Sequence, residues 1–347
     1  MARPKILLTR RWPEAVERRL AERYDAVFNP ADRPLDARAL GRALQDHDAL
    51  CPTVSDVVDA SVLEQARGGA ARIIGNYGVG VNHIDLEAAS DLGLVVTNTP
   101  GVLTDATAEL AMLLMLMAAR RVGEGERELR AGGWTGWRPT HNVGTQVTGA
   151  TLGLIGYGRI AQAVARMAHR GFGMRILYNS RRRASPEVEA ETGAAFHPEV
   201  DTLMAEADFI SLHCPGGPET FHLVDERRLG LMKPTAFLIN TARGPVIDEA
   251  ALTRALKARR IAGAGLDVYE AEPRVERALL ELQNVVLSPH LGSATQESRT
   301  AMGMKVADNL DAFFEGRDPP DTEIQNSASQ RAWLWPTWRS TSFSRVR

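Results

Sequence analysis

Short apolar runs alternate with longer segments whose apolar residues recur at helical spacing along most of the chain. The apolar runs predict strands at 5–9, 48–51, 71–75, 94–97, 151–155, 174–178, 208–212, 235–239, 261–266 and 285–287. The helical spacing predicts helices at 14–22, 36–45, 84–91, 159–170, 248–259 and 296–315. Because alternating strands and helices are typical of parallel sheets with helices on both faces, we expect an α/β fold.

The number of predicted strands indicates two doubly wound sheets, and the length of 347 residues also favours two domains. A boundary is predicted near residues 98–105, where Pro100 and Gly101 break the preceding strand. A single helix is predicted from about 105 to 130. Its apolar stretch at 110–118 could pack either in a core or against a second subunit.

Composition and charge exclude several classes of protein. Apolar residues make up 44% and charged residues 24% of the chain, an ordinary globular balance. The net charge of −2 offers no electrostatic footprint for nucleic acid or an anionic membrane. The longest apolar run, Leu110 to Ala119, is too short to span a bilayer, and the N-terminus lacks the apolar run of a signal peptide. With only two cysteines, Cys51 and Cys214, a disulfide framework is excluded, so we expect a soluble, cytoplasmic protein with no metal site.

The end of the chain differs in composition from the rest. Trp333, Trp335 and Trp338 are three of the six tryptophans, and no acidic residue follows Glu323. We expect residues 323–347 to form a poorly ordered or non-native tail.

A glycine-rich turn follows the predicted strand at 151–155 and opens a predicted helix. Gly156, Gly158 and Ala161 match the pattern G-x-G-x-x-G/A of dinucleotide-binding folds. Gly156 permits the turn, Gly158 allows the backbone to approach a pyrophosphate, and the helix N-terminus faces the phosphates. Glycine in such turns also has purely structural uses, so the surrounding sequence must support the assignment.

That support comes from the end of the next strand, where an acidic residue would bind the hydroxyls of an adenosine ribose. Here the position holds Ser180, followed by Arg181, Arg182 and Arg183. Serine and arginine can hydrogen-bond a ribose 2′-phosphate, which a carboxylate would repel. We therefore place NADP(H) ahead of NAD(H), which stays possible; the alternative is that this is merely a solvated basic loop.

An earlier turn, Gly78-Val79-Gly80, lacks a third small residue and any downstream partner for a ribose. Its backbone N–H groups could hold a smaller anion, such as the carboxylate of a substrate.

Three ionisable residues follow successive strands of the second predicted sheet: Arg243, Glu272 and His290. The carboxyl ends of parallel strands face one crevice, so these side chains can converge beside a bound dinucleotide. Each alone could be a surface, loop or turn residue, but the combination suits the reduction of a 2-oxo acid. Histidine can donate a proton near neutral pH, a carboxylate can orient the imidazole, and arginine can hold the substrate's carboxylate.

On these residues the sequence resembles the D-isomer-specific 2-hydroxyacid dehydrogenases, and most of all the glyoxylate/hydroxypyruvate reductases. The resemblance covers nearly all of residues 3–320. Its motifs are Asn76 to Asp85, Thr97 to Thr104, Thr107 to Glu109, Gly153 to Ala161, Thr241 to Gly244, Glu272-Pro273 and Ser288 to Ser293.

The resemblance implies two Rossmann-like domains: a substrate domain of residues 1–99 and 294–322, interrupted by a cofactor domain of residues 100–293. It also implies a homodimer formed largely through the cofactor domains. Arg243, Glu272 and His290 align with the family's catalytic residues, and Val79 and Gly80 with its backbone anchors for substrate. Trp137 matches a tryptophan that in glyoxylate reductases can reach the partner's active site, although it could equally be a packed loop aromatic. Besides Gly156 and Gly158, the positions that match cofactor contacts are Thr107, Arg159, Ile160, Ser180, Arg181, Arg182, Pro215, Thr220, Thr241, Asp267 and Gly292.

The sequence thus predicts an NAD(P)H-dependent reductase of glyoxylate and hydroxypyruvate. A D-lactate-type or broader 2-oxo-acid reductase is the alternative, because one methylene in a pocket changes binding only modestly. From other classes, a corepressor that shares this fold and binds NAD(H) would need a peptide-docking surface or regulatory tails, and nothing outside the tail suggests one. The intact triad argues against a nucleotide-binding regulator without turnover.

Overall fold

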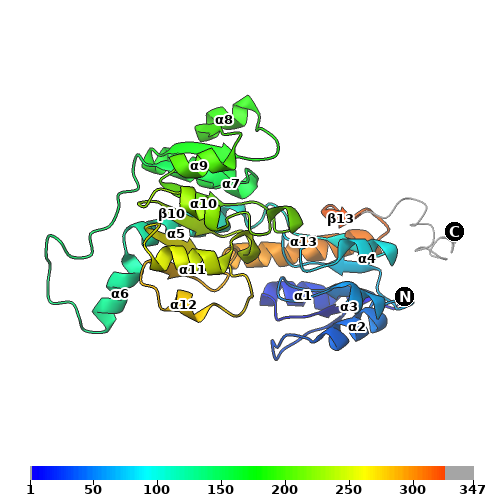
Figure 1. Cartoon of the computed structure of the whole chain (residues 1–347). Helices are drawn as coiled ribbons and strands as arrows, with labels where there is room; N and C mark the ends of the chain where they lie inside the picture. The colour runs from blue at the N-terminus through cyan, green and yellow to red at the C-terminus, as the bar shows by residue number, and fades with distance from the viewer. Residues whose placement is uncertain (1, 325–347) are drawn as a thin grey trace, which may run out of the picture. The chain divides into compact units, whose positions relative to one another are not determined.

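The computed structural model describes residues 2–324, which form two compact units (Figure 1). Within that range unit 1 comprises residues 2–102 and 296–324, and unit 2 comprises residues 103–295. Each unit contains its own sheet, and the chain enters and leaves unit 2 from unit 1. The predicted fold class, two Rossmann-like α/β domains with one inserted into the other, is therefore confirmed.

Unit 1 is built on a six-stranded sheet with the order β13-β5-β4-β3-β1-β2. All its strands pair in parallel except β13, which runs antiparallel to β5. Helix α1 lies against α13, and Arg19 of α1 bonds Asp308 and Asp311 of α13. The elements are β1 (Lys5–Leu8), α1 (Glu14–Arg23), β2 (Asp25–Val27), α2 (Ala37–Asp46), β3 (Ala49–Cys51), α3 (Ala60–Glu64), β4 (Ile73–Gly75), α4 (Leu86–Asp91), β5 (Val95–Thr97), α13 (Gln296–Phe314) and β13 (Thr322–Ile324).

Unit 2 contains a seven-stranded parallel sheet with the order β12-β11-β10-β9-β6-β7-β8. Alternate residues of its central strands enter two cores, one on each face: Phe209 and Phe237 pack with α5 and α7, whereas Ile210 and Leu238 pack with α9 and α11. The sheet is thus covered on both sides, as a buried parallel sheet requires. The elements are α5 (Thr104–Ala119), α6 (Val122–Arg130), β6 (Thr151–Ile155), α7 (Arg159–Phe172), β7 (Arg175–Asn179), α8 (Pro186–Thr192), β8 (Ala194–Phe196), α9 (Val200–Glu206), β9 (Phe209–Leu212), η1 (Pro218–Thr220), α10 (Glu226–Leu231), β10 (Phe237–Asn240), η2 (Gly244–Val246), α11 (Glu249–Lys257), β11 (Gly263–Leu266), α12 (Arg277–Leu280) and β12 (Val285–Leu287).

Three strands were not predicted by the hydrophobic pattern: β2, β8 and β13. All three lie at the edges of their sheets and are three residues long. An edge strand has a neighbour on one side only, so its residues need not form a continuous apolar run.

The prediction of one helix over 105–130 is wrong, because the chain breaks between α5 and α6. Arg121 adopts a left-handed conformation with φ of 55°, which ends α5. Its guanidinium then donates to both carboxylate oxygens of Glu124, at 3.0 and 2.7 Å. The glycines at 123 and 125 are poor helix formers, so the sequence after the break favours a separate, shorter helix.

The tail was expected to begin at residue 323. Glu323 and Ile324 instead complete β13, so the ordered fold extends two residues further. The expectation for 325–347 lies outside the described residues.

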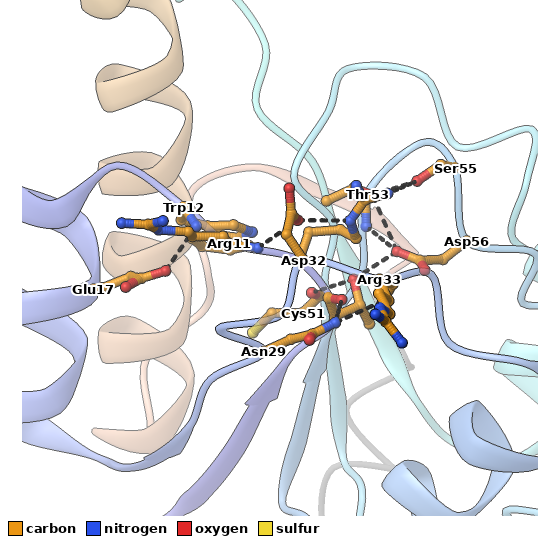
Figure 2. A network of polar contacts seen from close by, with 12 residues as sticks. Arg11, Trp12, Glu17, Asn29, Asp32, Arg33, Cys51, Thr53, Ser55 and Asp56 are labelled. Atoms are coloured by element: carbon orange, nitrogen blue, oxygen red, sulfur yellow. Dashed lines mark hydrogen bonds and ion pairs between the residues drawn. The ribbon is translucent and has the colours of Figure 1, made fainter. Parts of the chain in front are cut away.

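Side-chain hydrogen bonds hold the loops that leave β1, β2 and β3 of unit 1 (Figure 2). The Asp56 carboxylate accepts from the Thr53 N–H at 2.8 Å and from the Thr9 hydroxyl at 2.5 Å. Asn29 donates from Nδ2 to the carbonyl oxygens of Thr9 and Arg33, at 2.8 and 2.7 Å. These side chains replace the partners that loop backbone lacks once a strand has ended. Among the helices of residues 2–324, none is both long and apolar enough to cross a membrane.

Candidate active site

The turn after β6 has the geometry of an anion cradle at the point where the strand order of unit 2 reverses. Gly156 has a φ of +85°, and a Cβ there would lie 2.5 Å from the backbone nitrogen of Cys214, so only glycine fits. Gly158 is the N-cap of α7 and has open space around it, and no side chain caps the helix. The first N–H groups of α7, beginning at Arg159 and Ile160, are therefore left for an anion.

The loop after β7 divides its three arginines between two environments. Arg183 already has a protein partner, because it donates to both carboxylate oxygens of Glu189 at 2.9 Å. Arg181 is 84% exposed and has only a 3.6 Å approach to Glu219. Arg182 is also exposed, and its carbonyl accepts from the Ser180 hydroxyl. Arg181 and Arg182 thus have guanidinium groups available for a ligand.

Apart from Thr107 on α5, the remaining predicted cofactor positions of unit 2 follow strands β9 to β12. Thr220 donates its hydroxyl to the Pro215 carbonyl at 2.7 Å, which closes the turn after β9. Thr107, on α5, donates to the Gly292 carbonyl at 3.0 Å. Thr241 is buried, and its hydroxyl oxygen has no hydrogen-bond partner among the described residues. A buried hydroxyl without a partner costs free energy, so it is a position where a ligand's polar group would fit.

The turn that carries Arg243 is determined by its neighbours. Asn240 accepts from the Ala242 N–H at 3.0 Å and donates to the Arg243 carbonyl at 2.9 Å, which folds the chain back after β10. A Cβ on Gly244 would lie 1.9 Å from the backbone of Tyr269. Only glycine therefore lets this turn lie directly against the loop that leads to Glu272.

The structure brings His290 and Glu272 together. His290 Nδ1 lies 2.8 Å from Glu272 Oε2, and the Tyr269 N–H donates to Glu272 Oε1 at 2.9 Å. Burial alone would raise the pKa of Glu272, but the hydrogen bond from His290 and the charges of His290 and Arg243 lower it. Burial lowers the pKa of Arg243, and the negative charge of Glu272 opposes that shift. Arg243, Glu272 and His290 are called the candidate triad below.

Asp267 fixes the loop that carries His290. Its Oδ1 accepts from the Ser288 hydroxyl at 2.6 Å and the Leu291 N–H at 2.7 Å, and its Oδ2 accepts from the Gly292 N–H at 2.8 Å. Burial raises the pKa of Asp267, although these hydrogen bonds oppose the shift. The N–H of His290 itself donates to the Asp267 carbonyl, so the loop is tied at several points to the end of β11.

In unit 1, Val79 and Gly80 follow β4, and within the described residues 2–324 no hydrogen bond uses their N–H groups. Trp137 lies in the long loop after α6, which extends away from the unit 2 sheet (Figure 1), and is 82% exposed.

Comparison with known proteins identifies the family. The model of the D-isomer specific 2-hydroxyacid dehydrogenase NAD-binding domain matches residues 112–292. The chain is 47% identical to a glyoxylate reductase of Thermococcus onnurineus over 322 residues, covering 92% of this chain and 95% of the relative. The chain belongs to the D-isomer specific 2-hydroxyacid dehydrogenase family.

Solved structures of other 2-hydroxyacid dehydrogenases share the fold. A putative D-isomer specific 2-hydroxyacid dehydrogenase of Polaromonas has a TM-score of 0.86 at 37% identity, over 93% of this chain and 100% of that one. An NADPH-dependent glyoxylate/hydroxypyruvate reductase of Sinorhizobium meliloti, solved with NADP and malonate, has a TM-score of 0.82 at 34% identity, over 92% and 97% of the two chains. The protein is thus an oxidoreductase, and its unit 2 is the NAD-binding domain of the family.

Several residues that shape this dehydrogenase site were missed by the sequence analysis. Asn240 donates to the Arg243 carbonyl, and the Ser288 hydroxyl donates to the Asp267 carboxylate. These short polar side chains could have been recognised as turn-forming residues at the ends of strands. His222 and Glu270 form a second histidine–carboxylate contact of 2.9 Å beside the Glu272 loop. No local pattern indicated this pair, because its members are 48 residues apart.

The lowered pKa of Glu272 predicts a pH-dependent contribution to stability. A carboxylate whose pKa is depressed in the folded state stabilises the protein above its unfolded pKa of about 4.3. That contribution is lost as the pH falls through the folded pKa. Glu272→Gln should therefore lower the melting temperature at pH 7, and this effect should shrink as the pH is lowered from 7 through the folded pKa of Glu272.

Thermal unfolding of both proteins over this pH range measures the difference. Glu281→Gln, which changes a carboxylate with 67% of its side chain exposed, is the control and should follow the wild type at every pH. A gap between wild type and Glu272→Gln that does not change with pH would contradict the assignment.

Proposed function

We propose that this dehydrogenase reduces glyoxylate to glycolate and hydroxypyruvate to D-glycerate, with His290 as the proton donor. The observation that carries the proposal is the 2.8 Å contact between His290 and Glu272. His290 follows β12 and Glu272 follows β11, the strand that lies between β12 and β10, and Arg243 follows β10. The Thermococcus relative is a glyoxylate reductase and the Sinorhizobium relative a glyoxylate/hydroxypyruvate reductase, which supports this choice of substrates. A D-lactate-type or broader 2-oxo-acid reductase is the alternative.

The residues of the triad would divide the chemistry as follows. Negative charge develops on the substrate's carbonyl oxygen as the carbonyl carbon is reduced. Nδ1 of His290 faces Glu272, so Nε2 is the ring atom left to donate a proton to that oxygen. Glu272 fixes the ring orientation and offsets the positive charge of the imidazolium. Arg243 would bind the substrate's carboxylate and polarise its carbonyl.

In unit 1, the free N–H groups of Val79 and Gly80 would bind the carboxylate of the substrate. Two backbone donors on adjacent residues can bind the two oxygens of one carboxylate.

The residues of unit 2 fit a dinucleotide, and the bound nicotinamide would supply the hydride. Gly156, Gly158, Arg159 and Ile160 would hold the pyrophosphate at the N-terminus of α7. Asp267 and Thr241 are placed at the ends of strands where polar groups of the nicotinamide half could bond. Contacts from Thr107, Pro215, Thr220 and Gly292 would complete the site.

We place NADP(H) ahead of NAD(H) because Ser180, Arg181 and Arg182 stand where an acidic residue would bind a ribose. The exposure of the two arginines supports this preference, since neither guanidinium is held by a close ion pair. The two cysteines are free and buried, which fits a reducing compartment such as the cytoplasm.

A spectrophotometric assay tests the reaction. The wild-type protein should oxidise NADPH when glyoxylate or hydroxypyruvate is added, and pyruvate should be the poorer substrate. His290→Gln should lower kcat by about a hundredfold or more, the usual contribution of a general acid, while the Kd for NADPH changes little. A normal kcat in this variant would remove His290 from the donor role. No turnover with any of the three acids would favour a corepressor-like NAD(H)-binding protein.

The cofactor preference has a matched control within one loop. Replacing Arg181 and Arg182 with alanine should raise the KM for NADPH by about tenfold and leave the KM for NADH unchanged, because only NADPH carries the 2′-phosphate. Arg183→Ala removes a guanidinium already bound to Glu189 and should affect both cofactors equally. Equal changes for NADPH and NADH in the Arg181 and Arg182 variants would show that those arginines are merely solvated.

We also propose that the chain forms a homodimer through unit 2. Trp137 of each subunit would then contribute to the active site of its partner. Exposed apolar side chains on α5, α6 and the following loop support it, with Leu113 48%, Leu129 59% and Trp137 82% exposed. Wild-type protein should sediment at twice the chain mass of 37.9 kDa. Leu113→Glu should sediment as a monomer, because it places a charge on that apolar face; a monomeric wild type would contradict the proposal.

A further inference from the structure

The loop of Gly78, Val79 and Gly80 has all three of its carbonyl groups bound to the protein. Asn76 Nδ2 donates to the carbonyl oxygens of Gly78 and Gly80, both at 3.1 Å. Asn98 Nδ2 donates to the Val79 carbonyl at 3.0 Å. Two side-chain amides therefore bind three successive carbonyls of one short loop.

Asn76 acts on this loop from within unit 1. It is fully buried, and its N–H donates to the Thr97 carbonyl of β5, so its backbone belongs to the sheet edge. Its Oδ1 lies 3.1 Å from Nε2 of His83. Because carbonyl oxygens can only accept, Nδ2 must face the loop and Oδ1 must face the histidine, which then donates from Nε2. His83 thereby fixes the orientation of the amide.

Asn98 is held in a similar way, by α13, by β13 and by the segment that joins them. Its N–H donates to the Asp321 carbonyl, and its carbonyl accepts from Asn309 Nδ2 of α13 at 3.3 Å. Its side chain also donates to Glu323 of β13. The C-terminal strand thus helps to orient the amide that holds Val79.

The direction of the carbonyls determines the direction of the N–H groups. In a planar trans peptide the N–H of one residue points opposite to the C=O of the residue before it. With the carbonyls of Gly78, Val79 and Gly80 turned toward the asparagines, the N–H groups of Val79, Gly80 and Val81 point away from them. In the described part of the chain none of these three N–H groups has a protein acceptor.

We infer that Asn76 and Asn98 are positioning residues that orient the Gly78–Gly80 loop so that its N–H groups bind the substrate's carboxylate. The inference rests on the proposed substrate role of Val79 and Gly80, and it adds the groups that make that role possible. A loop of this kind, with glycine at two of three positions, would otherwise sample many backbone conformations. Binding a carboxylate would then require the loop to be ordered first, at a cost in affinity.

The test measures the binding of oxamate, a carboxylate-bearing analogue of a 2-oxo acid, to the enzyme saturated with NADPH. Asn76→Asp keeps the size of the side chain but places carboxylate oxygens against two carbonyl oxygens. It should weaken oxamate binding by about tenfold and lower kcat/KM for glyoxylate in parallel, because two hydrogen bonds that orient the loop are lost. The Kd for NADPH should stay within about twofold, because the loop is in unit 1 and the dinucleotide site in unit 2. Asn98→Ala should act in the same direction.

Asn29→Ala is the matched control, because Asn29 also donates from Nδ2 to two loop carbonyls of unit 1, those of Thr9 and Arg33 (Figure 2). It should leave oxamate binding unchanged, even if it lowers the melting temperature. If Asn76→Asp does not fold, His83→Leu tests the same chain of contacts and should weaken oxamate binding by a smaller factor, with the same unchanged Kd for NADPH.

Unchanged oxamate binding in a folded Asn76 or Asn98 variant would overturn the inference, as would an equal loss in Asn29→Ala. Oxamate binding needs no turnover, so this result is separate from the outcome for the proposed reaction. A wild-type protein that binds oxamate but reduces no 2-oxo acid would contradict the proposed function alone.

Discussion

The parallel register of β10, β11 and β12 is the constraint on which the candidate active site depends. Asn240 pairs with Leu266, and Leu266 pairs with Leu287, so the three strands end at one level of the sheet. Every chain segment that leaves them starts from the same edge. The backbone hydrogen bonds of the sheet therefore bring the candidate triad together, although they lie away from the triad's side chains. The loops after the three strands must then be short and held in place.

Buried polar side chains hold those loops in both units. In unit 2, Asp267 accepts from the hydroxyl and N–H groups of the segment around His290. In unit 1, Asn76 does the converse and donates to the carbonyls of the loop after β4. An acceptor carboxylate turns N–H groups inward, whereas a donor amide turns carbonyls inward and leaves N–H groups outward. The choice of side chain thus determines which backbone groups a ligand would meet, since buried polar groups must be paired.

How well the sequence predicted each helix or strand depended on how much of that element is buried. The central strands, such as those predicted at 151–155 and 208–212, are continuous apolar runs because both of their faces are covered, and their positions were predicted. The edge strand β13 contains Thr322 and Glu323 and has a neighbour on one side only, so no apolar run marks it. The break at Arg121 was also missed, because a single left-handed residue does not interrupt the helical spacing of apolar residues.

The amino-acid pattern alone was enough to predict which residue types lie at strand ends: Gly156, the basic segment at 181–183, and the candidate triad. These follow from local chemistry, namely what fits a tight turn and what can follow a buried strand. Which of those groups are available for a ligand depends on the folded chain. Arg183 is bound to Glu189, whereas Arg181 and Arg182 have no close ion pair, and Asn76 rather than glycine alone orients the loop after β4. Arg181, Arg182 and Arg183 are identical in type, so only their positions in space show which of them has a close protein partner.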